Sequence, residues 1–86
     1  SMPTVFYHGK YRFYFFSNEF QATGLLEPIH IHIESGENEA KFWIEPQVSL
    51  ASNDGFRSKE LSEIEKVIEI NRNEIILKWK QHFNLK

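Results

Sequence analysis

The feature that most constrains the fold is a short run of strictly alternating residues, 29–34, in which isoleucine occupies every second position. Side chains along an extended strand point alternately to its two faces. One face therefore carries Ile29, Ile31 and Ile33, and the other carries His30, His32 and Glu34. The pattern predicts a strand whose isoleucine face lies against a core and whose opposite face gathers two imidazoles and a carboxylate.

Short β-prone segments on both sides of this run predict further strands. The expected strands cover residues 4–7, 10–16, 29–34, 39–45 and 48–50, with turns at 8–9, 36–38 and 52–55. Within the second strand, Tyr11, Phe13 and Phe15 share one face, and Arg12, Tyr14 and Phe16 share the other. Residues 17–26 show no periodicity, so we expect a loop there that leads to Pro28, and two hairpins account for the remaining pattern.

The last third of the chain has helical periodicity. Its apolar stripe consists of Leu61, Ile64, Val67, Ile68, Ile75, Trp79 and Phe83. Ser58 is the expected N-cap of the first helix. Polar residues 71–73 interrupt the stripe, and one straight helix over 58–83 would be about 39 Å long, whereas a domain of this size is about 25 to 30 Å across. We therefore expect two helices, or one helix kinked at residues 71–73, with a single long helix as the alternative.

These segments predict an α+β fold in a single domain of 86 residues. We expect a four- to five-stranded, mainly antiparallel sheet within residues 4–50, and a helix or helix pair within 58–83 that packs on one sheet face. Aromatic side chains supply much of the expected core, namely Phe6, Phe13, Phe15, Phe42 and Trp79. The face with His30 and His32 is expected to point away from that core.

Composition excludes some classes of function and weakens others. The chain has no cysteine, no basic and apolar leader pattern and no apolar run of membrane-spanning length, which favours a cytoplasmic protein without a membrane partner. Ser1 before Met2 is typical of an expression-tag scar. The formal net charge of -2 gives no overall attraction to nucleic acid, so such binding would need a local basic patch.

Five stretches of the sequence carry a resemblance to a known family. They are residues 2–5, 11–19, 28–33, 40–44 and the helix that begins at Ser58. In this combination the chain resembles the domain-of-unknown-function 4160 family over nearly its whole length, although Ile29 stands where a second proline is common. The resemblance implies a small prokaryotic protein encoded beside another small protein, an arrangement similar to toxin and antitoxin pairs. It implies no particular reaction.

A metal site is one interpretation of the histidine strand. Imidazoles at positions i and i+2 of a strand lie close enough to ligate one ion, and Glu34 would be a third ligand beside His30 and His32. A structural zinc site needs four ligands, and the chain offers only His8, His82 and scattered carboxylates as additions. We therefore expect no cofactor, and the metal site remains the third-ranked hypothesis.

Metal-independent RNA cleavage is the second-ranked interpretation. It needs a general base, a general acid and a cation that stabilises the phosphorane. His30 and His32 would share the acid and base roles, and Lys41 or Arg12 would stabilise charge. Tyr14 or Trp43 would stack on a base. Neighbouring carboxylates oppose tight binding of RNA, among them Glu34, Glu37, Glu39 and Glu45.

Binding of a protein partner ranks first because it requires no catalytic geometry of these residues. The same face would carry Trp43, Glu34 and Glu45 as contacts, together with Arg12 and Tyr14, and aromatic residues and arginine are the types that anchor interfaces. The expected partner is the small protein encoded by the adjacent gene. The simplest alternative to all three interpretations is a solvated sheet face without a role, and the sequence sets no oligomeric state.

Overall fold

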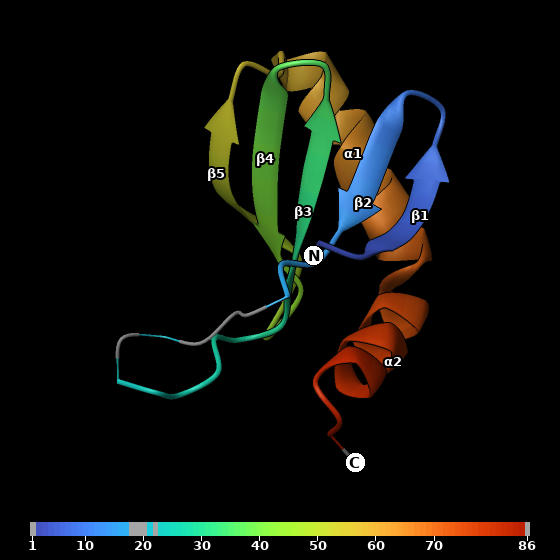
Figure 1. The fold of residues 1–86 in the computed structure, drawn as a ribbon. Coiled ribbons are helices and arrows are strands. Elements are labelled where there is room, and N and C mark those ends of the chain that lie inside the picture. Colours follow the sequence, from blue (N-terminus) through green and yellow to red (C-terminus); the bar gives the residue numbers. More distant parts are fainter. Residues whose placement is uncertain (1, 18–20, 22, 86) are drawn as a thin grey trace.

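The computed structural model describes residues 2–17, 21 and 23–85, so the expectation for Ser1 and the family-like positions 18 and 19 lie outside the described residues. Its strands are β1 (Thr4–His8), β2 (Tyr11–Tyr14), β3 (His30–Ser35), β4 (Asn38–Trp43) and β5 (Ser49–Asp54). They form one antiparallel sheet in sequence order, and helices α1 (Ser58–Ile70) and α2 (Arg72–His82) follow (Figure 1). The expected α+β fold is confirmed.

α1 covers one face of the sheet and passes behind the strands in the view of Figure 1, whereas α2 lies below the ends of the strands. Ile31, Ile33 and Phe42 of the sheet are almost fully buried in one cluster with Ile64 and Ile68 of α1. The isoleucine face of the alternating run is therefore the core face, as its period of two predicts. α1 does not cover the opposite sheet face, on which the polar residues of β3 lie, and α2 reaches this face only at its end, where the Trp79 ring lies 5.0 Å from the His30 ring.

The strand register sets which polar side chains become neighbours on that opposite face. His32 of β3 lies between Tyr14 of β2 and Lys41 of β4. Glu34 lies between Arg12 and Glu39 in the adjacent row, and His30 lies opposite Trp43. Directly opposite side chains in an antiparallel pair are within contact distance. The pairing of the two hairpins that was expected from the sequence is thus confirmed.

The helical half breaks at Asn71, which confirms two helices rather than one straight helix. The Asn71 side chain donates to the Val67 carbonyl oxygen at 2.8 Å, beside the bond that the Asn71 backbone N–H makes to the same oxygen at 3.1 Å. Five members of the predicted stripe are buried, namely Ile64, Val67, Ile68, Ile75 and Trp79. No helix within the described residues is both long and apolar enough to span a bilayer.

The start of α1 differs by one residue from the expectation. Arg57 is the N-cap and Ser58 is the first helical residue. Glu60, in the third helical position, accepts a hydrogen bond from the Arg57 backbone N–H at 3.2 Å. A glutamate in that position satisfies the backbone donor of the cap residue, so the serine hydroxyl is not needed for this role.

The last strand is longer than predicted, because residues 52–54 belong to β5 rather than to a turn. Ser52, Asn53 and Asp54 pair with Lys41, Ala40 and Glu39 of β4. The Asn53 side chain accepts from the Phe56 N–H at 3.1 Å and donates to the Phe56 carbonyl oxygen at 3.0 Å. Turn-forming residues therefore end the strand here, and the reversal comes at Gly55, which has a φ of +102°.

Candidate functional site

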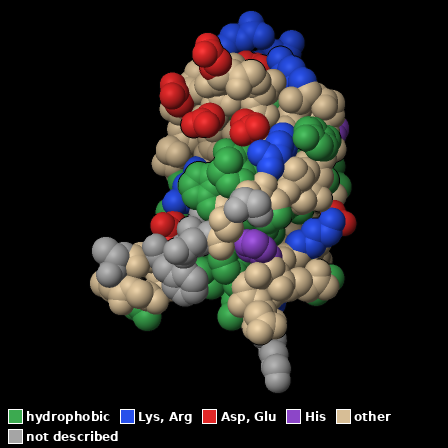
Figure 2. All heavy atoms as spheres, in the orientation of Figure 1, with side chains coloured by type: hydrophobic (Ala, Val, Ile, Leu, Met, Phe, Trp, Pro, Cys, Tyr) green, Lys and Arg blue, Asp and Glu red, His purple; other side chains and the backbone are tan. Residues whose placement is uncertain are grey.

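The uncovered side of the sheet, called here the open face, is built by alternate residues of β2 to β5. It consists of Arg12, Tyr14, His30, His32, Glu34, Glu39, Lys41, Trp43, Ser52 and Asp54. Figure 2 shows this face, with acidic side chains gathered at one end and hydrophobic side chains below them. The acidic end is the end at which β3 turns into β4, because Glu34, Glu39 and Asp54 follow one another across neighbouring strands.

His32 lies at the centre of the open face and is only 8% exposed. Its ring stacks on Phe16 with 3.9 Å between ring centroids and 13° between planes, and Tyr14 flanks it at 5.5 Å. Arg12 extends this stack, because its guanidinium carbon lies 4.4 Å from the centre of the Tyr14 ring. The alternative of an ordinary solvated face does not describe this imidazole, which is covered by aromatic rings.

His30 is more deeply enclosed than His32, with 1% of its surface exposed. Its ring packs edge-on against Trp43 at 5.5 Å and lies 5.0 Å from Trp79 of α2. Its Nδ1 lies 2.8 Å from the Pro28 carbonyl oxygen, and a carbonyl only accepts, so Nδ1 carries the proton. His30 thus joins the sheet to the second helix, which the period of the strand could not indicate.

Lys41 is held on the open face by two contacts. Its Nζ donates to Glu27 Oε1 at 2.8 Å and lies 4.4 Å from the centre of the Trp43 ring. The hydrogen bond from Lys41 is the main cause that keeps the pKa of Glu27 below its ordinary value, against the opposing effect of burial. Glu27 precedes the strand and was not among the expected site residues. Its position directly before Pro28, at the start of the histidine strand, could have indicated that it lies near the site.

Arg12 is held at the other side of the open face. Its Nε donates to the Thr4 hydroxyl at 2.8 Å, and its Nη1 lies 3.4 Å from Glu34 Oε2. Nη2 also donates to the carbonyl oxygen of Met2. Glu34 is therefore engaged by a cation, and both expected cations of the face have fixed positions.

A hollow of about 280 Å³ opens between the aromatic stack and β5. Its walls include Tyr14, Phe16, His32, Glu39, Lys41, Ser52 and Asp54. Aromatic rings form one side, and the Glu39 and Asp54 carboxylates stand on the other side, next to the edge strand. Asp54 was not singled out from the sequence, because it was assigned to a turn instead of a strand. Glu39 was named only as one of the carboxylates that oppose binding of RNA.

The structure brings together most of the expected site residues but not Glu45. Arg12, Tyr14, His32, Lys41 and Trp43 share the open face. Glu45 lies beyond β4, is exposed, and has Oε2 3.9 Å from Arg72 Nη2 at the start of α2. It therefore does not contribute to the hollow.

The geometry gives little support to a metal site formed by His30, His32 and Glu34. Glu34 pairs with Arg12, and the His30 Nδ1 is bonded to a backbone carbonyl. Within residues 2–17, 21 and 23–85, no group of three or more His, Asp or Glu side chains is arranged to hold a metal ion. The open face instead carries aromatic rings, the cations Arg12 and Lys41, and the Glu39 and Asp54 carboxylates.

The comparison with protein families places this geometry in a family. A family model described as "Domain of unknown function (DUF4160)" matches residues 11–80. The chain belongs to the DUF4160 family. The segment that matches DUF4160 begins with β2 and ends within α2, so it contains every residue of the open face but not β1. No curated protein and no solved structure matches the chain.

Proposed function

We propose that this DUF4160 domain acts by binding a small protein partner through the open face, as one component of a toxin–antitoxin-like two-gene module in the cytoplasm. The partner is the protein encoded by the adjacent gene. The observation that carries the proposal is a sheet face that no helix packs across, which holds aromatic rings, two cations in fixed positions and a hollow lined in part by Tyr14, Phe16 and Lys41. Aromatic residues and arginine are concentrated at the energetic centres of protein interfaces.

The rigidity of these side chains supports binding. Arg12 is held over Tyr14 and against Glu34, and Lys41 is held over Trp43 and against Glu27. A side chain that is already ordered loses less conformational entropy when a partner arrives. Phe16 is 38% exposed, so a large apolar ring is available at the edge of the hollow.

The two histidines have a supporting role in this proposal. His30 is enclosed by Trp43 and Trp79, and His32 lies against Phe16. Both imidazoles thereby fix the rings that a partner would meet. Stacked and edge-to-face ring pairs of this kind stabilise by about 0.5 to 1.5 kcal/mol each beyond the area that they bury.

RNA cleavage stays the weaker proposal. Aromatic rings beside cations are typical of surfaces that bind single-stranded RNA, which is the observation in its favour. A general acid or base must come within hydrogen-bond distance of the reacting oxygen, and His30 is 1% exposed. Glu39 and Asp54 at the rim would also repel a phosphate backbone.

Co-expression with the product of the adjacent gene tests the partner proposal. We expect the two chains to co-purify as a complex. Trp43→Ala should lower the affinity of this complex at least about tenfold, because truncation of an aromatic anchor costs about 2 kcal/mol or more at such interfaces. Isothermal titration calorimetry measures this change.

Leu77→Ala is the matched control, because Leu77 is 56% exposed on α2, away from the open face. It should leave the affinity unchanged. Thermal unfolding of each variant checks that the fold is intact. Absence of a complex, or equal affinities for Trp43→Ala and the wild type, would overturn the proposal.

A further inference from the structure

We propose that the hollow beside β5 receives an arginine side chain of the protein partner, with the guanidinium between the aromatic stack and the Glu39 and Asp54 carboxylates. This inference rests on the proposed function and names the chemistry that the partner must present. It is carried by the charge around the hollow, by the shape of its aromatic wall and by its place next to an edge strand.

Glu39 and Asp54 form an uncompensated acidic pair. They lie directly opposite each other on β4 and β5, and both are exposed. Like charges at opposite positions of an antiparallel pair destabilise the sheet. Within the described part of the chain neither carboxylate makes an ion pair. A cation bound between them would remove this repulsion.

The cations near the hollow are directed elsewhere. Lys41 Nζ bonds to Glu27 and lies over Trp43, and Arg12 pairs with Glu34. Their charges are therefore balanced by other carboxylates, and the negative charge of Glu39 and Asp54 dominates the rim. Figure 2 shows the resulting gathering of acidic side chains above the hydrophobic part of the face. The charge complement of this rim is a positively charged ligand.

The opposite wall favours a planar cation. Phe16 stacks on His32 with 13° between the ring planes, and Tyr14 continues the wall. A guanidinium stacks on aromatic faces and pairs with carboxylates in a fixed fork, whereas an ammonium is a compact, strongly hydrated charge. The volume of about 280 Å³ is just below the range of pockets for drug-sized ligands, so it suits one side chain.

The neighbouring backbone favours a protein as the source of this guanidinium. β5 is the last strand of the sheet and has β4 as its only strand neighbour among the described residues. An extended segment lying along an exposed strand edge gains main-chain hydrogen bonds and places alternate side chains over adjacent positions. A segment along β5 would thus bring its side chains to Ser52 and Asp54 at the mouth of the hollow.

A peptide titration tests the inference on the intact chain without the partner. The probes are acetyl-Gly-Arg-Gly-amide and its citrulline and lysine analogues, followed by ¹H–¹⁵N correlation spectra. We expect the arginine peptide to shift the amides of Glu39, Lys41 and residues 52–54 with a dissociation constant of about 1 mM. Citrulline has nearly the same shape without the charge and should cause no saturable shift, and lysine should bind at least about threefold more weakly.

Charge-neutral variants supply the control. Glu39→Gln with Asp54→Asn should raise the dissociation constant of the arginine peptide at least about fivefold, because each exposed charge contact is modest. Glu65→Gln with Glu69→Gln removes two exposed carboxylates from α1 and should leave the constant unchanged. Absence of saturable arginine binding, equal binding of citrulline, or equal effects of the two variant pairs would overturn the inference.

The partner complex separates this inference from the proposed function. If the complex is weakened by Trp43→Ala but not by Glu39→Gln with Asp54→Asn, the arginine anchor is wrong and the proposed function stands. If no complex forms while the arginine peptide binds as expected, the proposed function is wrong and the hollow is still a guanidinium site. Weakening by both variants supports both.

Discussion

His30 shows how a polar residue becomes part of the core without losing its hydrogen bond. Its ring contacts Trp43 on the sheet and Trp79 on α2, and its Nδ1–H reaches the Pro28 carbonyl oxygen. Burial of a polar side chain is tolerated when its donors and acceptors are satisfied. The residue therefore connects the loop before β3, the sheet and the second helix.

Replacement of His30 by Ala should destabilise the fold strongly. The substitution removes a ring that is 1% exposed and leaves the Pro28 carbonyl without its donor. We expect a loss of about 2 to 4 kcal/mol in the free energy of unfolding, because the cavity and the unsatisfied acceptor add. Urea denaturation followed by tryptophan fluorescence measures the loss.

His8→Ala is the comparison for this measurement, because the His8 side chain is 50% exposed and faces Glu63 at 3.8 Å. Its cost should stay within about 0.5 kcal/mol. Equal costs at positions 8 and 30 would contradict the structural role of His30.

The single-residue level is also where the sequence was least informative. Alternation placed His30 and His32 on the same face, and the register confirms this. It could not show that Phe16 and Trp79 would cover them, because those residues lie in other elements and period two describes one strand only. Burial, which decides the chemistry, is a tertiary property here.

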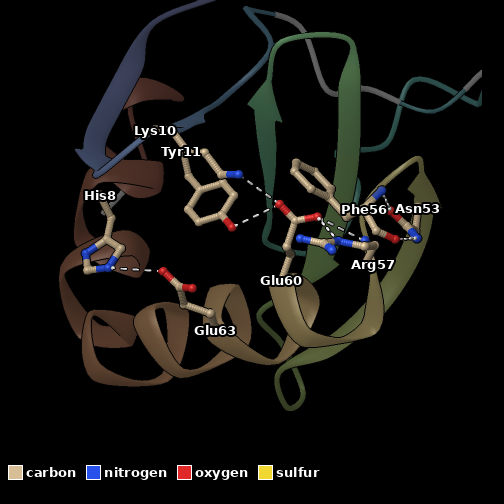
Figure 3. A network of polar contacts seen from close by, with 8 residues as sticks. All are labelled: His8, Lys10, Tyr11, Asn53, Phe56, Arg57, Glu60 and Glu63. Carbon is tan, nitrogen blue, oxygen red and sulfur yellow. Dashed lines mark hydrogen bonds and ion pairs between the residues drawn. The ribbon is translucent and has the colours of Figure 1, made fainter.

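At the scale of elements, Glu60 links α1 to the first hairpin through polar contacts (Figure 3). Its Oε2 lies 3.1 Å from Lys10 Nζ and accepts from the Tyr11 hydroxyl at 3.3 Å. Its Oε1 accepts from the Arg57 N–H. That backbone bond, followed by the bond from Lys10, lowers the pKa of Glu60 to about 2. The carboxylate is therefore stabilised in its charged form.

The free energy of unfolding should depend on pH through the titration of Glu60. A carboxylate whose pKa is lower in the folded than in the unfolded state contributes stability above its unfolded pKa, and this contribution is lost as the pH falls through the folded pKa. With values of about 2 and 4.5, the loss should extend from about pH 4.5 down to pH 2. We expect Glu60→Gln to be less stable than the wild type at neutral pH and to approach it in acid.

Urea midpoints across this pH range measure the effect, and Glu65→Gln, an exposed change in the same helix, is the control. A constant difference between Glu60→Gln and the wild type at every pH would show that the charge of Glu60 is not responsible.

The junction of β5 and α1 offers a second test between elements. Gly55 has a φ of +102°, and a Cβ there would clash with the Asn38 side chain at the start of β4. Gly55→Ala should therefore cost at least about 1 kcal/mol more than Gly36→Ala, which also has positive φ but has open space around it. In an Asn38→Ala background the part of the excess that comes from the clash should disappear, because the Asn38 Oδ1 and Cγ atoms are gone, and the part that comes from the φ of +102° should stay. Equal costs of the two glycine substitutions in denaturant titrations would contradict the clash.

Element boundaries could be predicted where a local pattern decides them. The hairpins and the break at Asn71 follow from alternation and from a polar gap in the apolar stripe. The end of β5 could not be predicted in this way, since residues 52–54 are typical of turns and become a strand only by pairing with β4. Because these residues were assigned to a turn, the position of Asp54 opposite Glu39 could not be predicted either.

The two sides of the sheet differ in composition across the whole molecule. One sheet face and the two helices enclose the apolar cluster, and the open face combines aromatic rings with an acidic end. The open face of this 86-residue chain presents the 38% exposed Phe16 ring beside a hollow, and this is a feature to explain. Its chemistry suits a protein better than a polyanion, because the net charge is -2 and the two cations are already paired.

Purified protein should therefore neither cleave nor bind single-stranded RNA at physiological salt. The exposed Glu39 and Asp54 repel phosphates, and binding of RNA depends on cations that release counterions. Fluorescence anisotropy and gel analysis of labelled RNA, with a chelator present, measure both activities. Glu39→Lys with Asp54→Lys reverses the rim and should create salt-sensitive binding, which shows that the sign of this charge matters.

The catalytic arm of this test needs His32→Gln instead of alanine at both histidines, because loss of His30 also removes core packing. Cleavage by the wild type that disappears in His32→Gln at an unchanged thermal midpoint would contradict the partner-binding proposal and establish the RNA-cleaving alternative. Absence of cleavage in the wild type, together with RNA binding only after charge reversal, would leave the open face as a surface for a basic protein partner.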